Sequence, residues 1–241
     1  SSVAALMETI GSGAVTAPFS ESLNADVILV VGANPAENHP VAATFFKNAV
    51  RNGTSLMVMD PRGQALKNHC KYMLANKPGT DVAVLNAMMH TIIEEGLYDQ
   101  QFVKNRTEGF VELRRHLGKF SADSVAKECG VDPELIISCA REFGTAKKAM
   151  IFWGMGVSQH IHGTDNARCL IGLALLTGQI GRPGTGLHPL RGQNNVQGAS
   201  DAGLVPMLYP DYRPVSDPKA RMFFEDFWNA ELDPNPGLTV V

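Results

Sequence analysis

A short polar stretch, His188 to Gly198, carries the most chemically capable side chains of this sequence. Arg191 offers a planar fork of donors that suits a carboxylate or a phosphate in two parallel hydrogen bonds. The amides beside it can donate and accept at once: Gln193, Asn194, Asn195 and Gln197. Because no hydrophobic period marks a helix or a strand, we predict a loop that holds a polar ligand. The alternative is a surface loop whose amides bond their own backbone, and composition does not separate the two.

The elements that would position this loop begin with an apolar strand. Residues 26–32 form a continuous β-branched run that closes on Gly32, as expected of a parallel strand covered on both faces. A loop over 33–40, a helix over 41–51 and a second strand over 55–60 follow. This βαβ unit has about the length of half a nucleotide-binding fold.

Two features of the βαβ unit could bind a nucleotide. The loop after the first strand leads into a helix start, where free N–H groups favour an anion such as a phosphate. Asp60 ends the second strand, where Rossmann folds keep the acid that accepts from ribose hydroxyls. A simpler interpretation makes Asp60 a turn former before Pro61 and Glu37 a first-turn acid that stabilises its helix.

The loop after the first strand does not have the glycine pattern of an ordinary dinucleotide site. Gly32 is present, but Asn34, Glu37 and Asn38 stand where further glycines would let a dinucleotide approach closely. The sequence therefore disfavours ordinary NAD binding.

The rest of the first 193 residues alternates between predicted strands and helices. Strands are predicted over 71–76 and 149–156, and helices from 80 or 81 to 96, from 121, from 132 and over 164–177. We predict an α/β fold, a doubly wound, mainly parallel Rossmann-like sheet with helices on both faces over 1–193. A ligand would lie outside the carboxyl ends of the strands, where the loops after Gly32, Asp60 and Gly154 meet Arg191. His160 and His162 are interpreted as turn residues rather than metal ligands.

Residues 194–241 differ in texture from the part before them. They are rich in proline and carry several aromatic side chains, so they would make little core of their own. We interpret them as a partial segment of an adjoining domain. The first residue is Ser1 and no signal peptide follows it, which suggests a processed chain or a piece of something larger.

Composition excludes several classes of function. The 241 residues are 44% hydrophobic and 19% charged, which predicts a folded globular protein. A net charge of -3 without a Lys/Arg run argues against nucleic acid as a partner. No apolar stretch reaches the roughly 18 residues that cross a bilayer, so no membrane contact is expected. The four cysteines show no CxxC pair, which predicts no metal site and free thiols in a reducing, cytoplasmic compartment.

Several motifs together resemble one enzyme family, and the match runs over the whole chain. They occupy residues 32–40, 60–62, 153–157, 176–181 and 191–201. The sequence resembles the catalytic α subunit of molybdenum- or tungsten-dependent formate dehydrogenases, in the bis-molybdopterin guanine dinucleotide (dimethyl sulfoxide reductase) superfamily. The Asn-Pro and Asp-Pro-Arg elements are widespread in that superfamily, whereas the string from Arg191 to Gly198 is more particular to formate dehydrogenases.

The resemblance implies a role for particular residues. One pterin dinucleotide would have its guanosine and diphosphate held by Asn34, Glu37, Asn38, Asp60, Arg62, Gly79 and Asp81. Met155, Gln159 and Gln193 would lie along the cofactor nearer the metal. Arg191 would pair with the formate carboxylate and orient its C–H bond toward the metal centre as carbon dioxide forms.

The resemblance also implies parts that this sequence does not contain. In the family, the cysteine or selenocysteine that ligates the metal lies a few residues before the position of Ser1, and 4Fe-4S clusters and the second pterin are held elsewhere. We therefore expect the parent to oxidise formate with its remaining domains and electron-transfer subunits as partners. The isolated chain is expected to be inactive and without bound cofactor.

Two alternative functions come from other classes. One is a sister molybdopterin enzyme, such as a nitrate reductase, or an accessory protein that uses the same fold. The other is a non-catalytic nucleotide-binding or interaction module that uses the βαβ unit alone. The Arg-Gly-Gln-Asn-Asn string favours formate over nitrate.

Overall fold

The computed structural model describes residues 1–238. The chain divides into two compact units, Ser1–Leu190 and Arg191–Val241, and each is described by itself. Among the described residues, no helix is both long enough and apolar enough to cross a bilayer.

The first unit is built on a sheet of five parallel strands in the order β3-β2-β1-β4-β5. Their bounds are β1 (Val27–Val31), β2 (Ser55–Met59), β3 (Tyr72–Leu74), β4 (Ala149–Trp153) and β5 (Gly186–Pro189). The strand order reverses direction between β1 and β4, which makes this the switch point where such folds open a crevice. The predicted doubly wound parallel sheet is confirmed.

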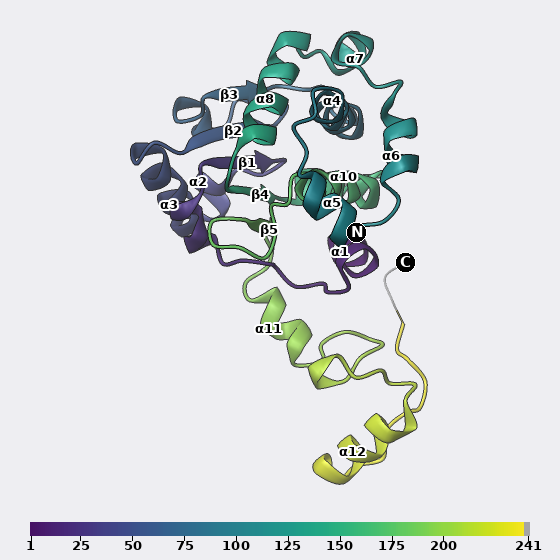
Figure 1. Cartoon of the computed structure of the whole chain (residues 1–241). Helices are drawn as coiled ribbons and strands as arrows, with labels where there is room; N and C mark the ends of the chain where they lie inside the picture. The colour runs from purple at the N-terminus through teal and green to yellow at the C-terminus, as the bar shows by residue number, and fades with distance from the viewer. Residues whose placement is uncertain (239–241) are drawn as a thin grey trace. The chain divides into compact units, whose positions relative to one another are not determined.

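Helices cover both faces of the sheet (Figure 1). They are α1 (Ser2–Ile10), η1 (Phe19–Asn24), α2 (Pro35–Asn38), α3 (Pro40–Arg51), η2 (Ala65–Asn68), α4 (Asp81–Glu94), α5 (Gln100–Arg106), α6 (Phe110–Leu117), α7 (Ala122–Cys129), α8 (Pro133–Thr145), α9 (Met155–Ser158) and α10 (Gly163–Leu176). In Figure 1, α3 lies on one side of the sheet, and α4, α8 and α10 lie on the other.

Alternate residues of each strand enter different halves of the core. Leu29 of β1 packs into the cluster shared with α4, α8 and α10, whereas Ile28 packs into the cluster that contains Phe46 of α3. The Phe46 and Phe152 rings meet at a centroid distance of 4.5 Å. Because both faces are buried, every residue of β1 and β4 must be apolar, which is the pattern that predicted these strands.

The stretch from His188 to Gly198 is not the continuous loop that its composition predicted. His188 and Pro189 end β5, and Val196 begins α11 (Val196–Asp201). The prediction missed β5 because four residues are too few for a period. The residues of β5 form a strand because they pair with β4, as Leu187 does with Ile151. On the edge of β5 that faces away from β4, Leu187 is hydrogen-bonded to Thr16. The Thr16 N–H donates to the Leu187 carbonyl at 3.1 Å, and Thr16 Oγ1 accepts from the Leu187 N–H at 2.8 Å.

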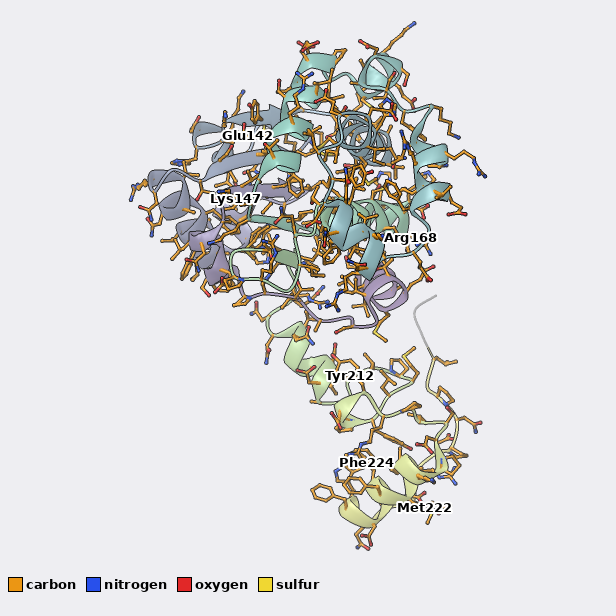
Figure 2. The ribbon with its side chains drawn as sticks, in the orientation of Figure 1. Glu142, Lys147, Arg168, Tyr212, Met222 and Phe224 are labelled. Carbon is orange, nitrogen blue, oxygen red and sulfur yellow. The ribbon has the colours of Figure 1, made fainter. Side chains whose placement is uncertain are left out.

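The described part of the second unit, residues 191–238, contains three short elements and a small core. They are α11, the 3-10 turn η3 (Pro210–Tyr212) and α12 (Pro218–Trp228). The core consists of Tyr209, Val215, Ala220 and Phe224. Phe224 on α12 is labelled in Figure 2 and is buried, whereas Phe223 and Phe227 beside it are exposed.

Candidate functional site

The loops after β1 and β4 lie in backbone contact at the switch point. The Gly156 N–H donates to the Gly32 carbonyl at 3.0 Å. A Cβ at Gly154 would stand 2.7 Å from the same carbonyl oxygen, and one at Gly32 would stand 2.7 Å from the Val157 nitrogen. This close approach of two backbones explains the glycines, which the sequence had offered as a place for a ligand.

Asn34 follows this contact and brings a buried polar atom to the carboxyl edge of the sheet. The residue occupies the N-cap position of α2 but makes no capping hydrogen bond through its side chain. It is 9% exposed, and its Oδ1 has no hydrogen-bond partner within residues 1–238. A buried acceptor without a donor costs about 1–3 kcal/mol, so Asn34 fits a site that a ligand donor completes.

Glu37 and Asn38 lie on α2 itself and are both exposed. Glu37 stands in the first turn of this single-turn helix, so the role of a helix-stabilising acid agrees with its position as well as a ligand role does.

Asp60 lies at the carboxyl end of β2 and is buried to 4% exposure. Its Oδ1 accepts a hydrogen bond from the Arg62 N–H at 2.8 Å, so the turn-forming interpretation is correct for one of its oxygens. The Arg62 side chain is exposed. Gln64 ties this loop to the loop after β1, because its Nε2 donates to the Ala33 carbonyl at 2.9 Å. Sequence reasoning did not single out Gln64.

The loop between β3 and α4 brings a second buried carboxylate to the same region. Asp81 is 7% exposed and accepts at Oδ1 from Asn76 Nδ2 at 3.4 Å. Burial raises the pKa of the Asp81 carboxyl, against the opposing effects of the Asn76 hydrogen bond and of His160, while the charge of Asp60 adds to the rise. Asn76 is 2% exposed, and its Oδ1 has no partner among the described residues. Asn76 is a further candidate that the sequence did not reveal.

His160 also belongs to this region, although its sequence context predicted a turn residue. Its Cε1 atom lies 3.6 Å from the point where a Cβ on Gly79 would stand, and Gly79 itself has a φ of +87°. The His160 Nδ1 atom is buried and has no hydrogen-bond partner within the described part of the chain. Its electrostatic effect opposes the rise in the pKa of the Asp81 carboxyl.

Met155 and Gln159 flank the single turn of α9 that follows Gly154. Both are exposed, Met155 to 40%, and the Gln159 N–H donates to the Met155 carbonyl at 2.8 Å. Both side chains are therefore accessible just beyond the carboxyl end of β4.

Arg191 and Gln193 belong to the second unit. Arg191 Nη2 donates to Gln197 Oε1 at 2.9 Å, whereas the Gln193 side chain is exposed. That Arg191 lies close to the loops after Gly32, Asp60 and Gly154 stays a prediction. Asn195 caps α11 by accepting from the Gly198 N–H at 3.2 Å, so for this amide the backbone-bonding alternative is correct.

The donors of the first unit suit an organic ligand better than a bare metal ion. Within residues 1–238 there is no group of three or more His, Cys, Asp or Glu side chains that could hold a metal. The buried groups in this region are instead two amide oxygens, two carboxylates and one imidazole nitrogen, the Nδ1 of the half-buried His160. Such a set is matched by the hydroxyl and N–H donors of a nucleotide.

Comparisons with known proteins agree with this geometry. A family model described as "Molybdopterin oxidoreductase" matches residues 3–231. The chain is 44% identical to an "F420-dependent formate dehydrogenase subunit alpha" of Methanocaldococcus jannaschii over 99% of this chain and 35% of that protein. It is 45% identical to "Formate dehydrogenase H" of Escherichia coli, with 97% and 33% covered. The chain thus spans about a third of the length of these curated relatives.

A solved structure has the same fold. The acetylene hydratase from Pelobacter acetylenicus superposes with a TM-score of 0.68 at 29% sequence identity, and the match covers 73% of this chain and 24% of that one.

Proposed function

The chain belongs to the molybdopterin oxidoreductase family, and we propose that it is the central, cofactor-holding part of a formate dehydrogenase. Formate would be oxidised to carbon dioxide by the whole protein, of which this chain is one part. The observation that carries the choice of substrate is the level of identity to two formate dehydrogenases over nearly the full chain. Arg191 supports it, because a guanidinium is a good partner for a small carboxylate.

Membership of this family implies a molybdopterin cofactor. We propose its guanine dinucleotide form, carrying molybdenum or tungsten. Its guanosine and diphosphate would be held by Asn34, Glu37, Asn38, Asp60, Arg62, Gly79 and Asp81. Met155, Gln159 and Gln193 would lie nearer the metal. The fit rests on the buried Asn34 Oδ1 and on the carboxylates of Asp60 and Asp81, since all three are acceptors for ribose hydroxyls and guanine N–H groups.

The residues of this chain have two tasks in the proposed reaction. Those at the strand ends bind and immobilise the cofactor, which supplies the two-electron redox chemistry. Arg191 binds the formate carboxylate through paired N–H donors and so fixes the direction of the C–H bond. Residues 1–193 would form the dinucleotide-binding domain, and 194–241 would belong to an adjoining one.

Other parts of the enzyme complete the proposed catalyst. We propose that 4Fe-4S clusters and electron-transfer subunits carry electrons away, and that the remaining domains of the parent complete the cofactor site. The isolated 241-residue chain is accordingly expected to be metal-free and inert.

The proposal is tested by replacing Arg191 in the intact parent. Because hydrogen bonds to charged groups contribute about 1.5–3 kcal/mol, Arg191→Ala should lower kcat/KM for formate by roughly 10- to 100-fold, with an increased KM. The assay uses an artificial electron acceptor, and metal analysis confirms that wild type and variant are equally loaded. An unchanged kcat/KM would remove Arg191 from the substrate site.

The same assay separates the alternatives. A parent that reduces nitrate and does not oxidise formate would be a sister enzyme. The acetylene hydratase from Pelobacter acetylenicus has the same fold and a different name for its reaction, so the fold itself does not select the reaction. Binding of GDP to the 241-residue chain, weakened by Asp60→Ala, would support the assigned nucleotide site.

A further inference from the structure

The second unit contains a tight turn with an unusual residue. Tyr209 donates its N–H to the Arg213 carbonyl at 2.8 Å, and residues 210–212 form the turn between them. Asp211 and Tyr212 have φ values of 62° and 56°. Consecutive residues of positive φ also occur in type I′ turns, where Asn-Gly or Asp-Gly is favoured. Tyr212 occupies the position where glycine would be the unstrained residue.

Tyr212 differs in type from the other non-glycine residues of positive φ in the described chain. Those are Asn195, Asp211 and Asn229, and asparagine and aspartate tolerate this conformation because their side chains bond locally. A bulky aromatic residue has no such advantage. Strain of this kind persists where the surroundings over-determine the position, and it is frequent at functional sites.

The hydroxyl of Tyr212 is held in a closed set of hydrogen bonds. It donates to Asp201 Oδ1 at 2.8 Å and accepts from Gln197 Nε2 at 3.0 Å. Gln197 Nε2 also donates to Asp201 Oδ1 at 3.1 Å, because the two residues lie four apart on α11 and share a helix face. The amide plane of Gln197 is thereby fixed by two partners on its nitrogen side.

With its nitrogen held, Gln197 presents its oxygen to Arg191. Arg191 Nη2 donates to Gln197 Oε1 at 2.9 Å. The carboxylate of Asp201 polarises the amide through Nε2 and makes Oε1 a better acceptor, so the contact with the guanidinium is strengthened. Tyr212 is labelled in Figure 2, on the turn of the second unit that follows α11.

From this chain of contacts we propose that Tyr212, Asp201 and Gln197 are positioning residues that fix the plane of the Arg191 guanidinium for its carboxylate substrate. The inference rests on the proposed function of Arg191. A guanidinium that rotated freely would present its paired N–H donors to formate for only part of the time. Locking one Nη2 N–H onto Gln197 leaves the fork in a defined direction before substrate arrives.

The test compares two variants that lose the same atom. Tyr212→Phe removes the bonded hydroxyl and keeps the ring and the backbone conformation. Tyr209→Phe is the matched control, because it lies in the same hairpin, is 8% exposed, and has a hydroxyl without a hydrogen-bond partner among the described residues. In the intact parent, Tyr212→Phe should raise KM for formate by about 5-fold at unchanged metal content, and Tyr209→Phe should leave it unaltered.

A second measurement does not depend on activity. In the intact parent, nitrogen-15 NMR of the Arg191 side chain reports rotation of its guanidinium. Tyr212→Phe and Asp201→Asn should both accelerate that rotation, and Tyr209→Phe should not. Tyr212→Gly serves as a folding control, since it relieves the positive φ while it also removes the hydroxyl. It should retain the fold and still accelerate the rotation.

The outcomes distinguish a failure of the positioning role of Tyr212 from a failure of the proposed formate dehydrogenase function. If Tyr212→Phe matches Tyr209→Phe in guanidinium rotation, the positioning role is wrong. Faster rotation with an unchanged KM in an active parent also overturns it. If the wild-type parent does not oxidise formate, the proposed function fails instead, and the NMR comparison still decides whether Tyr212 orders Arg191.

Discussion

The residues that distinguish this protein are polar groups in places where burial or strain is costly. The left-handed backbone at Tyr212 costs on the order of 1–3 kcal/mol, and the buried Oδ1 atoms of Asn34 and Asn76 each forgo a hydrogen bond. A sequence selected for stability alone would have glycine at the first position and smaller or apolar side chains at the others. Departures of this kind are frequent at functional sites, where stability is exchanged for activity.

Asp81 gives a prediction on pH dependence. Its folded-state pKa lies above the ordinary value of 3.8, chiefly because the side chain is buried. The protonated carboxyl therefore stabilises the folded state below pH 3.8, and this stabilisation is lost as the pH rises through the raised pKa of the folded state. At pH 7, Asp81→Asn should unfold at a higher temperature than wild type, and the difference should shrink below pH 3.8.

Thermal unfolding of the 241-residue chain between pH 3 and pH 8 measures this effect. Asp123→Asn is the matched control, because Asp123 is also a first-turn acid but is exposed. Its loss should slightly lower stability through the helix dipole. A lower unfolding temperature for Asp81→Asn at pH 7 would contradict the assigned cost of its burial.

The candidate site residues that the sequence suggested are those with a positional rule or a family motif. Asp60 was proposed from its place at the end of a strand, and Asn34 from the resemblance to the formate dehydrogenase family. Asn76 and His160 stand in loops without a pattern, and only the folded chain brings His160 beside Gly79. A period or a motif cannot report such contacts between distant segments.

At the scale of elements, a partly buried hydrogen bond ties α1 to the sheet, in addition to the packing of Ala5 and Leu6 in the core. Trp153 ends β4 with no exposed surface, and its Nε1 donates to Ser2 Oγ at 2.9 Å. Arg168 of α10, labelled in Figure 2, binds Glu8 of α1 at 2.6 Å and adds a contact at the surface. The indole bond is less exposed than this ion pair, because Trp153 has no exposed surface whereas the Arg168 and Glu8 side chains are 44% and 56% exposed.

Removing the acceptor tests this attachment. Ser2→Ala leaves the Trp153 N–H buried without a partner, so the free energy of unfolding should fall by about 1–3 kcal/mol. Urea denaturation of the 241-residue chain measures the change. Ser12→Ala, at an exposed serine after α1, should alter stability by less than about 0.5 kcal/mol. Equal effects of the two substitutions would show that the indole bond does not hold α1.

Elements with strong local signals were predicted well. The helix starts expected near Ser121 and Asp132 are present, and both side chains accept capping hydrogen bonds, from the Ser124 and Glu134 N–H groups. The single turn α2 and the strand β5 were missed, since both are four residues long. Their conformation comes from neighbours in space rather than from local preference.

At the scale of the whole molecule, the two units differ in how much core each contains. Both large clusters of buried side chains lie within Ser1–Leu190, whereas Arg191–Val241 has a core of four residues. Since buried apolar area is the main stabilising contribution, the first unit has the means to fold alone and the second does not.

Expression of the two units separately tests this difference. Residues 1–190 should give one cooperative unfolding transition within a few degrees of that of the 241-residue chain. Residues 191–241 should show little secondary structure by circular dichroism. A folded, cooperatively melting second fragment, or an unfolded first one, would contradict this account. Residues 1–190 should also retain whatever affinity for GDP the full chain has.

The pairing of Thr16 with Leu187 has a consequence for self-association. An edge strand with free N–H and C=O groups is a template onto which a second chain can add, and long runs of such additions lead to fibrils. Along β5, Thr16 occupies the Leu187 N–H and carbonyl, and Pro189 has no N–H to offer. The β5 margin of the sheet therefore offers few free backbone groups at these positions, which disfavours the addition of a strand from a second chain at this edge.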